Sequence, residues 1–266
     1  MLETLLYVAS NVFLYMAGLF LLSIIVKRND IADVAWGGGF LVVLFSLMSI
    51  EDFISIHEWV VIVLVSLWAI RIIWHIGSRK LGESEEDRRY AGWRKEWKFF
   101  YLRSFLQVWM LQGALMIAVS MAYIPLFVSE HLARAQWGLT PLLLIGIGIW
   151  LLGFIFETVG DWQLRQFLAK PKNKGKLMTS GLWSLTRHPN YFGEVTQWWG
   201  IFIISLLGVG FGSILNIILL LIGPITITIL ILGVSGIPTV EKGREGPEWE
   251  KYVANTRPFF PLPRNN

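Results

Sequence analysis

The chain has 266 residues, of which 55% are hydrophobic and 16% are charged, and this charged share excludes an ordinary soluble domain, for which roughly 25% is typical. The absence of Cys excludes disulfides, a thiol nucleophile and thiolate metal ligands. The net charge of +4 does not indicate a nucleic-acid partner, because an excess of Lys and Arg in a membrane protein is more typical of cytoplasmic loops.

Apolar segments long enough, or nearly long enough, to cross a bilayer as helices recur along the chain. They are Leu2–Val26, Ile31–Ile50, Glu58–Ile76, Ser104–Phe127, Thr140–Phe156, Phe192–Leu207 and Ile214–Ser235. A secretory signal carries positive charge before its apolar run, whereas Glu3 comes first here, so we expect the first helix to be retained. We therefore predict an all-α fold, a single membrane domain over residues 1–266 with seven transmembrane helices.

The Lys and Arg residues predict how these helices are oriented. Of the 23, 2 follow the first segment, 8 lie in residues 77–103, 6 follow the fifth segment and 5 lie in the tail, so 21 share one side of the membrane. Arg134 lies on the opposite side, and Arg71 lies within the third segment. Because cytoplasmic loops are enriched in Lys and Arg, we predict an N-terminus outside and a C-terminus in the cytoplasm.

The start of the second segment combines a carboxylate with glycines. Asp33 lies one turn inside this segment, and a Trp-Gly-Gly-Gly run follows at residues 36–39. Glycines allow another backbone or a ligand to approach closely. Asp33 also has a structural interpretation, as a cap at the start of the helix or as a partner for Arg71.

Gly181–Gly200 carries polar and charged residues into the start of the sixth segment. Pro189 suits the first turn of a helix, where its missing N–H is not needed. Asn190, Glu194 and Gln197 then stand at i, i+4 and i+7 and share one helix face. A carboxylate at membrane depth is costly without a partner, which makes Glu194 a functional candidate. The alternative is an interfacial motif of Arg and aromatic residues.

The sequence lacks the common metal and dinucleotide motifs. Its four His residues, at positions 57, 75, 131 and 188, have no ligand spacing, and no HExxH motif occurs, so we expect no protein-bound metal. No GxGxxG follows a predicted strand, so a nucleotide site here would not be a Rossmann fold.

Three elements together resemble a known family. They are Arg187-His188-Pro189-Asn190-Tyr191-Phe192-Gly193-Glu194, the element from Asp161 to Arg165, and Arg257-Pro258-Phe259-Phe260-Pro261. Over residues 147–263 the chain is similar to the C-terminal domain of steroid 5α-reductases, above all to their bacterial membrane branch. Sterol C14 and Δ7 reductases and, more distantly, isoprenylcysteine and phospholipid methyltransferases share the Arg-His-Pro-like turn. That turn alone therefore leaves NADPH and S-adenosylmethionine both open.

Two details of the resemblance favour NADPH. First, the reductases share with this chain the pattern from Asn190 to Glu194. Second, they carry an Asp-x-x-x-Arg element that matches Asp161 and Arg165. The structural alternative for these two residues is a helical salt bridge. By this likeness Asn190 and Glu194 contact the nicotinamide end. Phosphates, ribose or adenine are served by Arg165, Arg187, Tyr252 and Arg257. The cofactor-binding residues so implied are Asp161, Arg165, Arg187, His188, Asn190, Tyr191, Glu194, Tyr252 and Arg257. Residues 104–266 would form the cofactor-binding part and residues 1–103 the substrate side.

The reaction implied by the resemblance is hydride transfer from NADPH to the β carbon of an α,β-unsaturated ketone, such as a 3-oxo-Δ4-steroid, with a proton added at the α carbon. In steroid 5α-reductases a Glu of a Gln-Glu-Leu-Pro motif and a Tyr donate to the carbonyl oxygen, but that motif is absent here. Asp33 is the nearest substitute, and Tyr90 is the candidate phenol, since a neutral Tyr is a hydrogen-bond donor. The alternative for Tyr90 is an interfacial aromatic residue.

We thus expect a multi-pass protein of the bacterial inner membrane, with NADPH binding from the cytoplasm and a lipophilic substrate arriving from the bilayer, in contact with membrane lipid. Two other classes stay open. One is S-adenosylmethionine-dependent methylation of a lipid or isoprenoid, and the other is a non-enzymatic sterol-binding or structural membrane protein. The sequence does not predict the oligomeric state.

Overall fold

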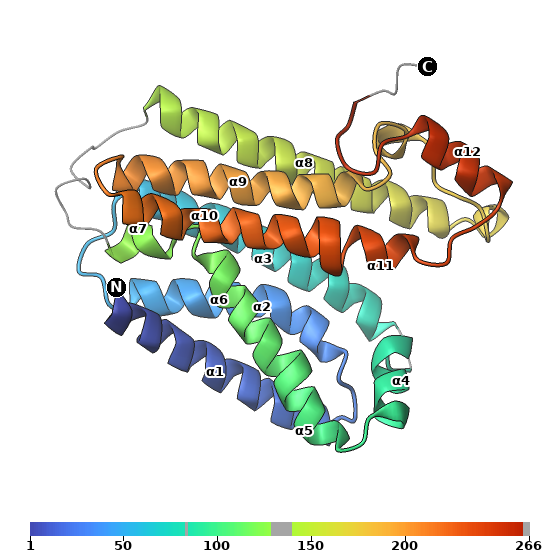
Figure 1. Cartoon of the computed structure of the whole chain (residues 1–266), viewed down its shortest axis with the longest axis horizontal. Helices are drawn as coiled ribbons and strands as arrows, with labels where there is room; N and C mark the ends of the chain where they lie inside the picture. The colour runs from blue at the N-terminus through green and yellow to red at the C-terminus, as the bar shows by residue number, and fades with distance from the viewer. Residues whose placement is uncertain (83–84, 129–139, 263–266) are drawn as a thin grey trace. The chain divides into compact units, whose positions relative to one another are not determined.

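The computed structural model describes residues 1–82, 85–128 and 140–262, which form helices and no strand (Figure 1). Seven helical segments in these residues are long and apolar enough to cross a membrane, which confirms the predicted all-α class and the number of spans. The first six are α1 (Leu2–Ile25), α2 (Ile31–Met48), α3 (Ile56–Leu81), Phe100–Ser120, Leu143–Leu168 within α8 (Pro141–Leu168), and α9 (Pro189–Val209). The seventh is Ile214–Glu241.

Two spans are composite and three helices are short. The fourth span joins α5 (Phe100–Ser104), a π-helical turn (Phe105–Met110) and α6 (Leu111–Ser120), and the seventh joins α10 (Ile214–Ile229), a π-helical turn (Leu230–Val234) and α11 (Ile237–Glu241). The short helices are α4 (Arg88–Glu96), α7 (Ile124–Val128) and α12 (Pro247–Asn255). Which ends face the cytoplasm stays a prediction, and Arg134 lies outside the described residues.

The sixth helix begins at Pro189, as predicted, but the fifth is longer than its apolar stretch. α8 continues past Phe156 to Leu168 and so carries Glu157 and Asp161 on consecutive turns. Hydrogen bonding within a helix does not require apolar side chains, so hydropathy underestimates the length of a helix that leaves the membrane. This extension places two carboxylates on a rigid element.

The chain divides into two compact units, which we describe separately. Unit 1 comprises Met1–Gly138 and Ser205–Ile222, and unit 2 comprises Leu139–Ile204 and Gly223–Asn266. The division expected at residues 103 and 104 concerned function rather than compactness, and it stays a prediction.

In unit 1 the glycine run of α2 packs against three other helices. A Cβ atom on Gly37 would lie 2.9 Å from the backbone oxygen of Ala69 in α3, while one on Gly38 would meet Tyr15 of α1 and one on Gly39 would meet Met116 of α6. The close approach expected at these glycines is therefore an approach of neighbouring helices. It makes α2 the central helix of unit 1 and holds the start of this helix, with its acidic residues, in place.

In unit 2 glycines bring α8 and α9 into backbone contact. A Cβ atom on Gly153 would lie 2.5 Å from the backbone oxygen of Gly193, and one on Gly193 would meet the backbone of Glu157. Two turns further along α9, a Cβ atom on Gly200 would lie 2.8 Å from the backbone nitrogen of Trp150. The contact lets short polar side chains bridge the two helices.

Candidate active site

In unit 1 the two residues predicted as the catalytic acid lie together. The Tyr90 hydroxyl donates a hydrogen bond to Asp33 Oδ1 at 2.7 Å, although 57 residues separate the two in the chain. Asp33 lies in the first turn of α2, and Tyr90 lies in α4, whose N-cap is Asp87. Tyr90 is 3% exposed, so it is a buried residue rather than an interfacial aromatic. The pairing does not test a catalytic role, which stays a prediction.

Two cations face the same aspartate. Arg89 Nη2 lies 3.1 Å from Asp33 Oδ2, and Lys80 Nζ lies 3.8 Å from it. Lys80 also lies 3.0 Å from Asp30 Oδ2 and 3.4 Å from Asp87 Oδ2, so one buried ammonium joins carboxylates from the start of α2 and the start of α4. Sequence reasoning missed Lys80, because 50 residues separate it from Asp30 and no local pattern relates them.

The charges around the phenol determine its protonation. Burial and the neighbouring Asp33 carboxylate raise the pKa of Tyr90 well above its usual value, against a smaller lowering effect of Arg89. The phenol therefore keeps its proton at neutral pH, and this proton is directed at Asp33. The neutral phenol is thus a hydrogen-bond donor that the Asp33 carboxylate holds in place.

In unit 2 two amides of α9 donate to two carboxylates of α8. Asn190 Nδ2 lies 3.1 Å from Asp161 Oδ1, and Gln197 Nε2 lies 2.6 Å from Glu157 Oε2. Asn190 Oδ1 and Gln197 Oε1 are both buried and have no hydrogen-bond partner within the described residues. Buried amide oxygens without a donor are rare and call for an explanation.

The structure adds Glu157 to the polar residues expected here and locates Glu194. Glu157 is 3% exposed and stands one turn before Asp161, so its i, i+4 spacing was a usable signal that the sequence-based assignment left out. Glu194 is half-buried, one turn beyond Asn190 on α9.

Two arginines of unit 2 have exposed guanidinium groups. Arg165 is exposed and forms neither an ion pair nor a side-chain hydrogen bond within the described residues, so the helical salt bridge to Asp161 is not formed. Arg257 is also exposed, and in the part of the chain that the structure describes its guanidinium has no partner either. Both cations are thus accessible to an anionic ligand.

Arg187, in contrast, is turned into the protein. Its Nε and Nη2 donate to the two carboxylate oxygens of Glu241 at 2.8 and 3.1 Å, and its Nη1 donates to the backbone oxygen of Thr256 at 2.8 Å. Its backbone N–H donates to the backbone oxygen of Arg257 at 2.9 Å. The predicted contact of Arg187 with a phosphate stays a prediction. In the structure this side chain joins the start of α9 to the C-terminal segment.

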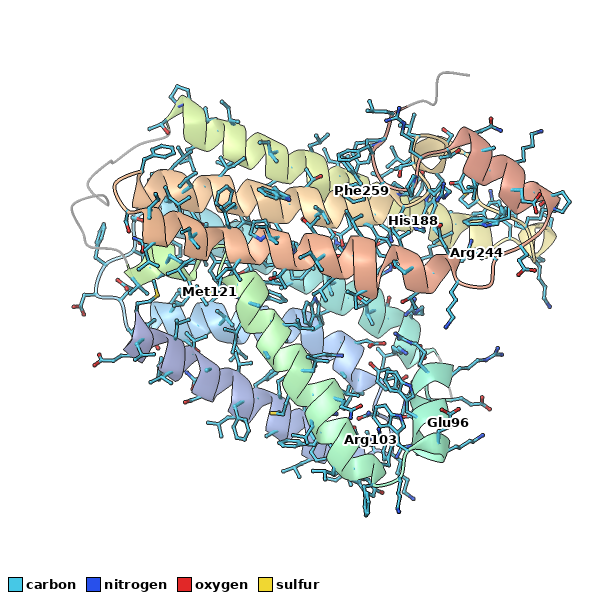
Figure 2. All side chains as sticks on the ribbon, viewed as in Figure 1. Glu96, Arg103, Met121, His188, Arg244 and Phe259 are labelled. Atoms are coloured by element: carbon cyan, nitrogen blue, oxygen red, sulfur yellow. The ribbon has the colours of Figure 1, made fainter. Side chains whose placement is uncertain are left out.

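His188 shares the Glu241 carboxylate. Its Nε2 lies 2.8 Å from Glu241 Oε1, and its ring stacks on Tyr191 with the centroids 5.4 Å apart. Burial lowers the pKa of His188 in spite of the opposing effect of Glu241, so the neutral imidazole donates its Nε2–H to the carboxylate. Further along α9, the Phe192 ring packs against Phe259 of the C-terminal segment with the centroids 5.7 Å apart, and Figure 2 labels His188 and Phe259.

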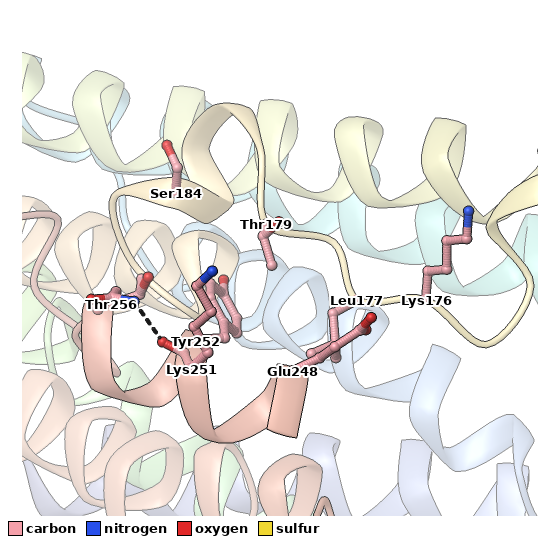
Figure 3. A pocket seen from close by; sticks show the side chains of 9 residues that line it. Lys176, Leu177, Thr179, Ser184, Glu248, Lys251, Tyr252 and Thr256 are labelled. Carbon is pink, nitrogen blue, oxygen red and sulfur yellow. Dashed lines mark hydrogen bonds between the residues drawn. The ribbon is translucent and has the colours of Figure 1, made fainter. Parts of the chain in front are cut away.

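A pocket of about 530 Å³ opens between α12 and the loop that precedes α9 (Figure 3). The Tyr252 hydroxyl donates to the backbone oxygen of Trp183, and burial raises the pKa of Tyr252 to about 12. The residues that line this pocket are Lys176, Leu177, Thr179, Ser184, Glu248, Lys251, Tyr252, Asn255 and Thr256. It offers two ammonium groups and several hydroxyls to a ligand.

A family model described as "Protein of unknown function (DUF1295)" matches residues 19–256, which is most of the sequence. The chain belongs to the DUF1295 family. This family is steroid 5α-reductase-like, which confirms the resemblance seen in the three sequence elements.

Curated relatives of this DUF1295 chain are similar over shorter segments. Human 3-oxo-5-alpha-steroid 4-dehydrogenase 1 is 39% identical over 66 residues, which are 24% of this chain and 25% of the relative. The mouse protein of the same name is 37% identical over 81 residues, which are 30% of this chain and 31% of the relative. The DUF1295 chain thus covers about a quarter to a third of the length of these relatives.

A further relative carries a different name. The probable O-methyltransferase ustE of Ustilaginoidea virens is 31% identical over 104 residues, which are 35% of the DUF1295 chain and 37% of the relative. No solved structure matches the chain.

Proposed function

We propose that this DUF1295 protein is an NADPH-dependent membrane reductase that reduces the C=C bond of a lipophilic enone such as a 3-oxo-Δ4-steroid. The observation that carries the proposal is the hydrogen bonding of Asn190. Its side-chain amide donates to Asp161, while its buried Oδ1 has no hydrogen-bond partner within the described residues. An open amide oxygen suits the carboxamide N–H of a nicotinamide. The similarity to 3-oxo-5-alpha-steroid 4-dehydrogenases supports the same reaction class.

The other residues of unit 2 suit the remaining parts of a dinucleotide. The open guanidinium groups of Arg165 and Arg257 are suited to its phosphates, because Arg binds phosphate oxygens in a bidentate manner. The pocket beside Tyr252 is large enough for a nucleoside. Glu194 would bind with Asn190 at the nicotinamide end, and His188, Tyr191 and Arg187 would hold the start of α9.

In this proposal NADPH, when bound, supplies the hydride. A new C–H bond forms at the β carbon, the C=C electron pair moves toward the carbonyl oxygen, and a proton is then added at the α carbon. Asp33 and Tyr90 would supply the acid, because Tyr90 stays protonated and is held by Asp33. We place the protein in the bacterial inner membrane, with the cofactor arriving from the cytoplasm and the substrate from the bilayer.

Ligand-dependent thermal stability of the detergent-purified protein tests the cofactor. A ligand that binds the folded state raises the unfolding temperature, so we expect NADPH to raise it and S-adenosylmethionine to leave it unchanged. Asn190→Leu removes the unpaired Oδ1 and should abolish most of the rise in unfolding temperature that NADPH causes. The matched control, Asn216→Leu, lies on α10 in unit 1, is not among the residues proposed to bind the cofactor, and should keep most of the NADPH-induced rise in unfolding temperature.

The runner-up function is S-adenosylmethionine-dependent methyl transfer to a lipid or isoprenoid, and its support is the similarity to the probable O-methyltransferase ustE. Stabilisation by S-adenosylmethionine alone would replace the reductase proposal with this one. Stabilisation by neither ligand would favour the non-enzymatic class.

A further inference from the structure

We propose that Arg89 is a catalytic residue that binds the carbonyl oxygen of the substrate and stabilises the negative charge formed there. This inference rests on the proposed function, because it names the group that the reduction of an enone requires. Reduction moves the C=C electron pair onto the carbonyl oxygen, and a fixed donor at that oxygen is often the largest contribution to catalysis.

The guanidinium of Arg89 is fixed by two carboxylates. Its Nε lies 3.1 Å from Asp87 Oδ1, and its Nη2 lies 3.1 Å from Asp33 Oδ2 and 3.4 Å from Asp87 Oδ2. Its carbon Cζ lies 5.4 Å from the centroid of the Tyr90 ring. A side chain held in this way loses little further freedom when it binds a ligand.

One nitrogen of this guanidinium remains available. Arg89 Nη1 has no partner within the described residues, and the side chain is 53% exposed, so two N–H donors point away from the carboxylates that hold the other nitrogens. Arg is always charged near neutral pH and has no acceptor, so these donors suit an oxygen that becomes negative.

Tyr90 by itself is poorly placed for this role in the resting protein. Its hydroxyl proton is already donated to Asp33 at 2.7 Å, whereas a carbonyl oxygen needs a free donor. An arrangement in which Arg89 Nη1 holds the oxygen leaves the Asp33 and Tyr90 pair to deliver the proton. The pair and the cation then perform separate tasks within one cluster.

The position of Arg89 in the chain also fits a lipophilic ligand with one polar end. Asp33, the partner of Arg89, lies in the first turn of a membrane span, and Arg89 lies on the short polar helix α4 outside the spans. A ligand with its apolar body in the bilayer and its carbonyl at the interface would place that oxygen at this level. This favours a substrate whose carbonyl group lies at one end of the molecule.

Steady-state kinetics on an accepted enone in detergent, with saturating NADPH, test the inference. Removal of one oxyanion donor typically lowers kcat by about 10²- to 10³-fold, so we expect Arg89→Gln to lower kcat by about this factor with KM changed little. Arg88→Gln is the matched control, because Arg88 is exposed on the same turn of α4 and has no partner within the described residues. It should keep wild-type kcat.

Arg89→His provides a second measurement that does not depend on the Gln variant being folded. The introduced imidazole replaces a guanidinium that contacts Asp33, Asp87 and the Tyr90 ring, and Lys80 contacts the same two carboxylates. It should carry charge below about pH 6.5, so activity relative to wild type should rise as the pH falls through this value. A flat ratio would contradict a role of the charge.

The outcomes separate the inference from the proposed function. If Arg89→Gln keeps a kcat within threefold of Arg88→Gln while NADPH still stabilises the protein, Arg89 is not the oxyanion donor and the reductase proposal stands. If Arg89→Gln loses NADPH stabilisation and substrate binding together, its role is structural and the inference is wrong. If wild type neither binds NADPH nor reduces any enone, the proposed function itself fails.

Discussion

At the scale of single residues, the cluster around Tyr90 uses charge for both stability and chemistry. Asp87 caps α4 by accepting the Arg89 backbone N–H at 3.0 Å, and its other oxygen lies 3.4 Å from Lys80 Nζ. The same residue thus starts the helix that carries Tyr90 and holds the guanidinium that we propose to bind substrate. A change at Asp87 should therefore affect stability and activity together.

Asp87 also predicts how stability depends on pH. Burial alone would raise its pKa, but hydrogen bonds from Arg89 and the charges of Arg89 and Lys80 lower it to about 2 from an ordinary 3.8. A lowered pKa stabilises the folded state above about pH 4, and this contribution is lost as the pH falls through about 2. We expect Asp87→Asn to unfold at a lower temperature than wild type at pH 6, with the difference shrinking toward pH 2.

Thermal unfolding of both proteins across this pH range measures the effect. Asp52→Asn is the control, because Asp52 is exposed and its loss should leave the pH dependence unchanged. A difference between wild type and Asp87→Asn that stays constant from pH 6 to pH 2.5 would contradict the prediction.

At the scale of elements, the contact of α8 with α9 sets the geometry of the Asn190 pair. A Cβ atom on Gly193 would meet the backbone of Glu157 and Gly153, which cannot move aside like a flexible side chain. Gly193→Ala should therefore separate the helices and destabilise the protein by about 1 to 3 kcal/mol, as overpacking usually does. It should also weaken NADPH binding, because Asn190 moves away from Asp161.

Unfolding temperature and NADPH titration of Gly193→Ala measure these two effects. Gly148→Ala, on the partner helix α8, is the matched control, since a Cβ atom on Gly148 meets nothing within 4 Å. This control should be neutral or slightly stabilising, because Ala loses less entropy than Gly in a helix. If both variants behave alike, the backbone contact is not what positions Asn190.

At the scale of the whole molecule, the seven spans and the charge distribution predict one topology. An odd number of spans places the termini on opposite sides, and 21 of the 23 Lys and Arg residues lie in segments assigned to the cytoplasm. We expect a reporter that functions only in the cytoplasm to be active when fused to the C-terminus. A reporter that functions only outside the membrane should be active when fused to the N-terminus. Two fusions reporting from the same side would contradict the number of spans or the orientation.

Local patterns in the sequence determined the helices and the family. Apolar length predicted seven spans, Pro189 marked the start of α9, and the spacing of Asp161 and Arg165 placed them on one helix face. These features depend on residues within a few turns of one another, so periodicity and local chemistry report them.

Only the tertiary structure decided which distant residues meet. It paired Tyr90 with Asp33, surrounded Lys80 with carboxylates, and turned Arg187 toward Glu241 rather than outward. It also left Arg89 Nη1 open beside the phenol within the described residues. Such pairings depend on how helices pack and on which charges must be neutralised when they are buried, and neither is encoded at a fixed spacing along the chain.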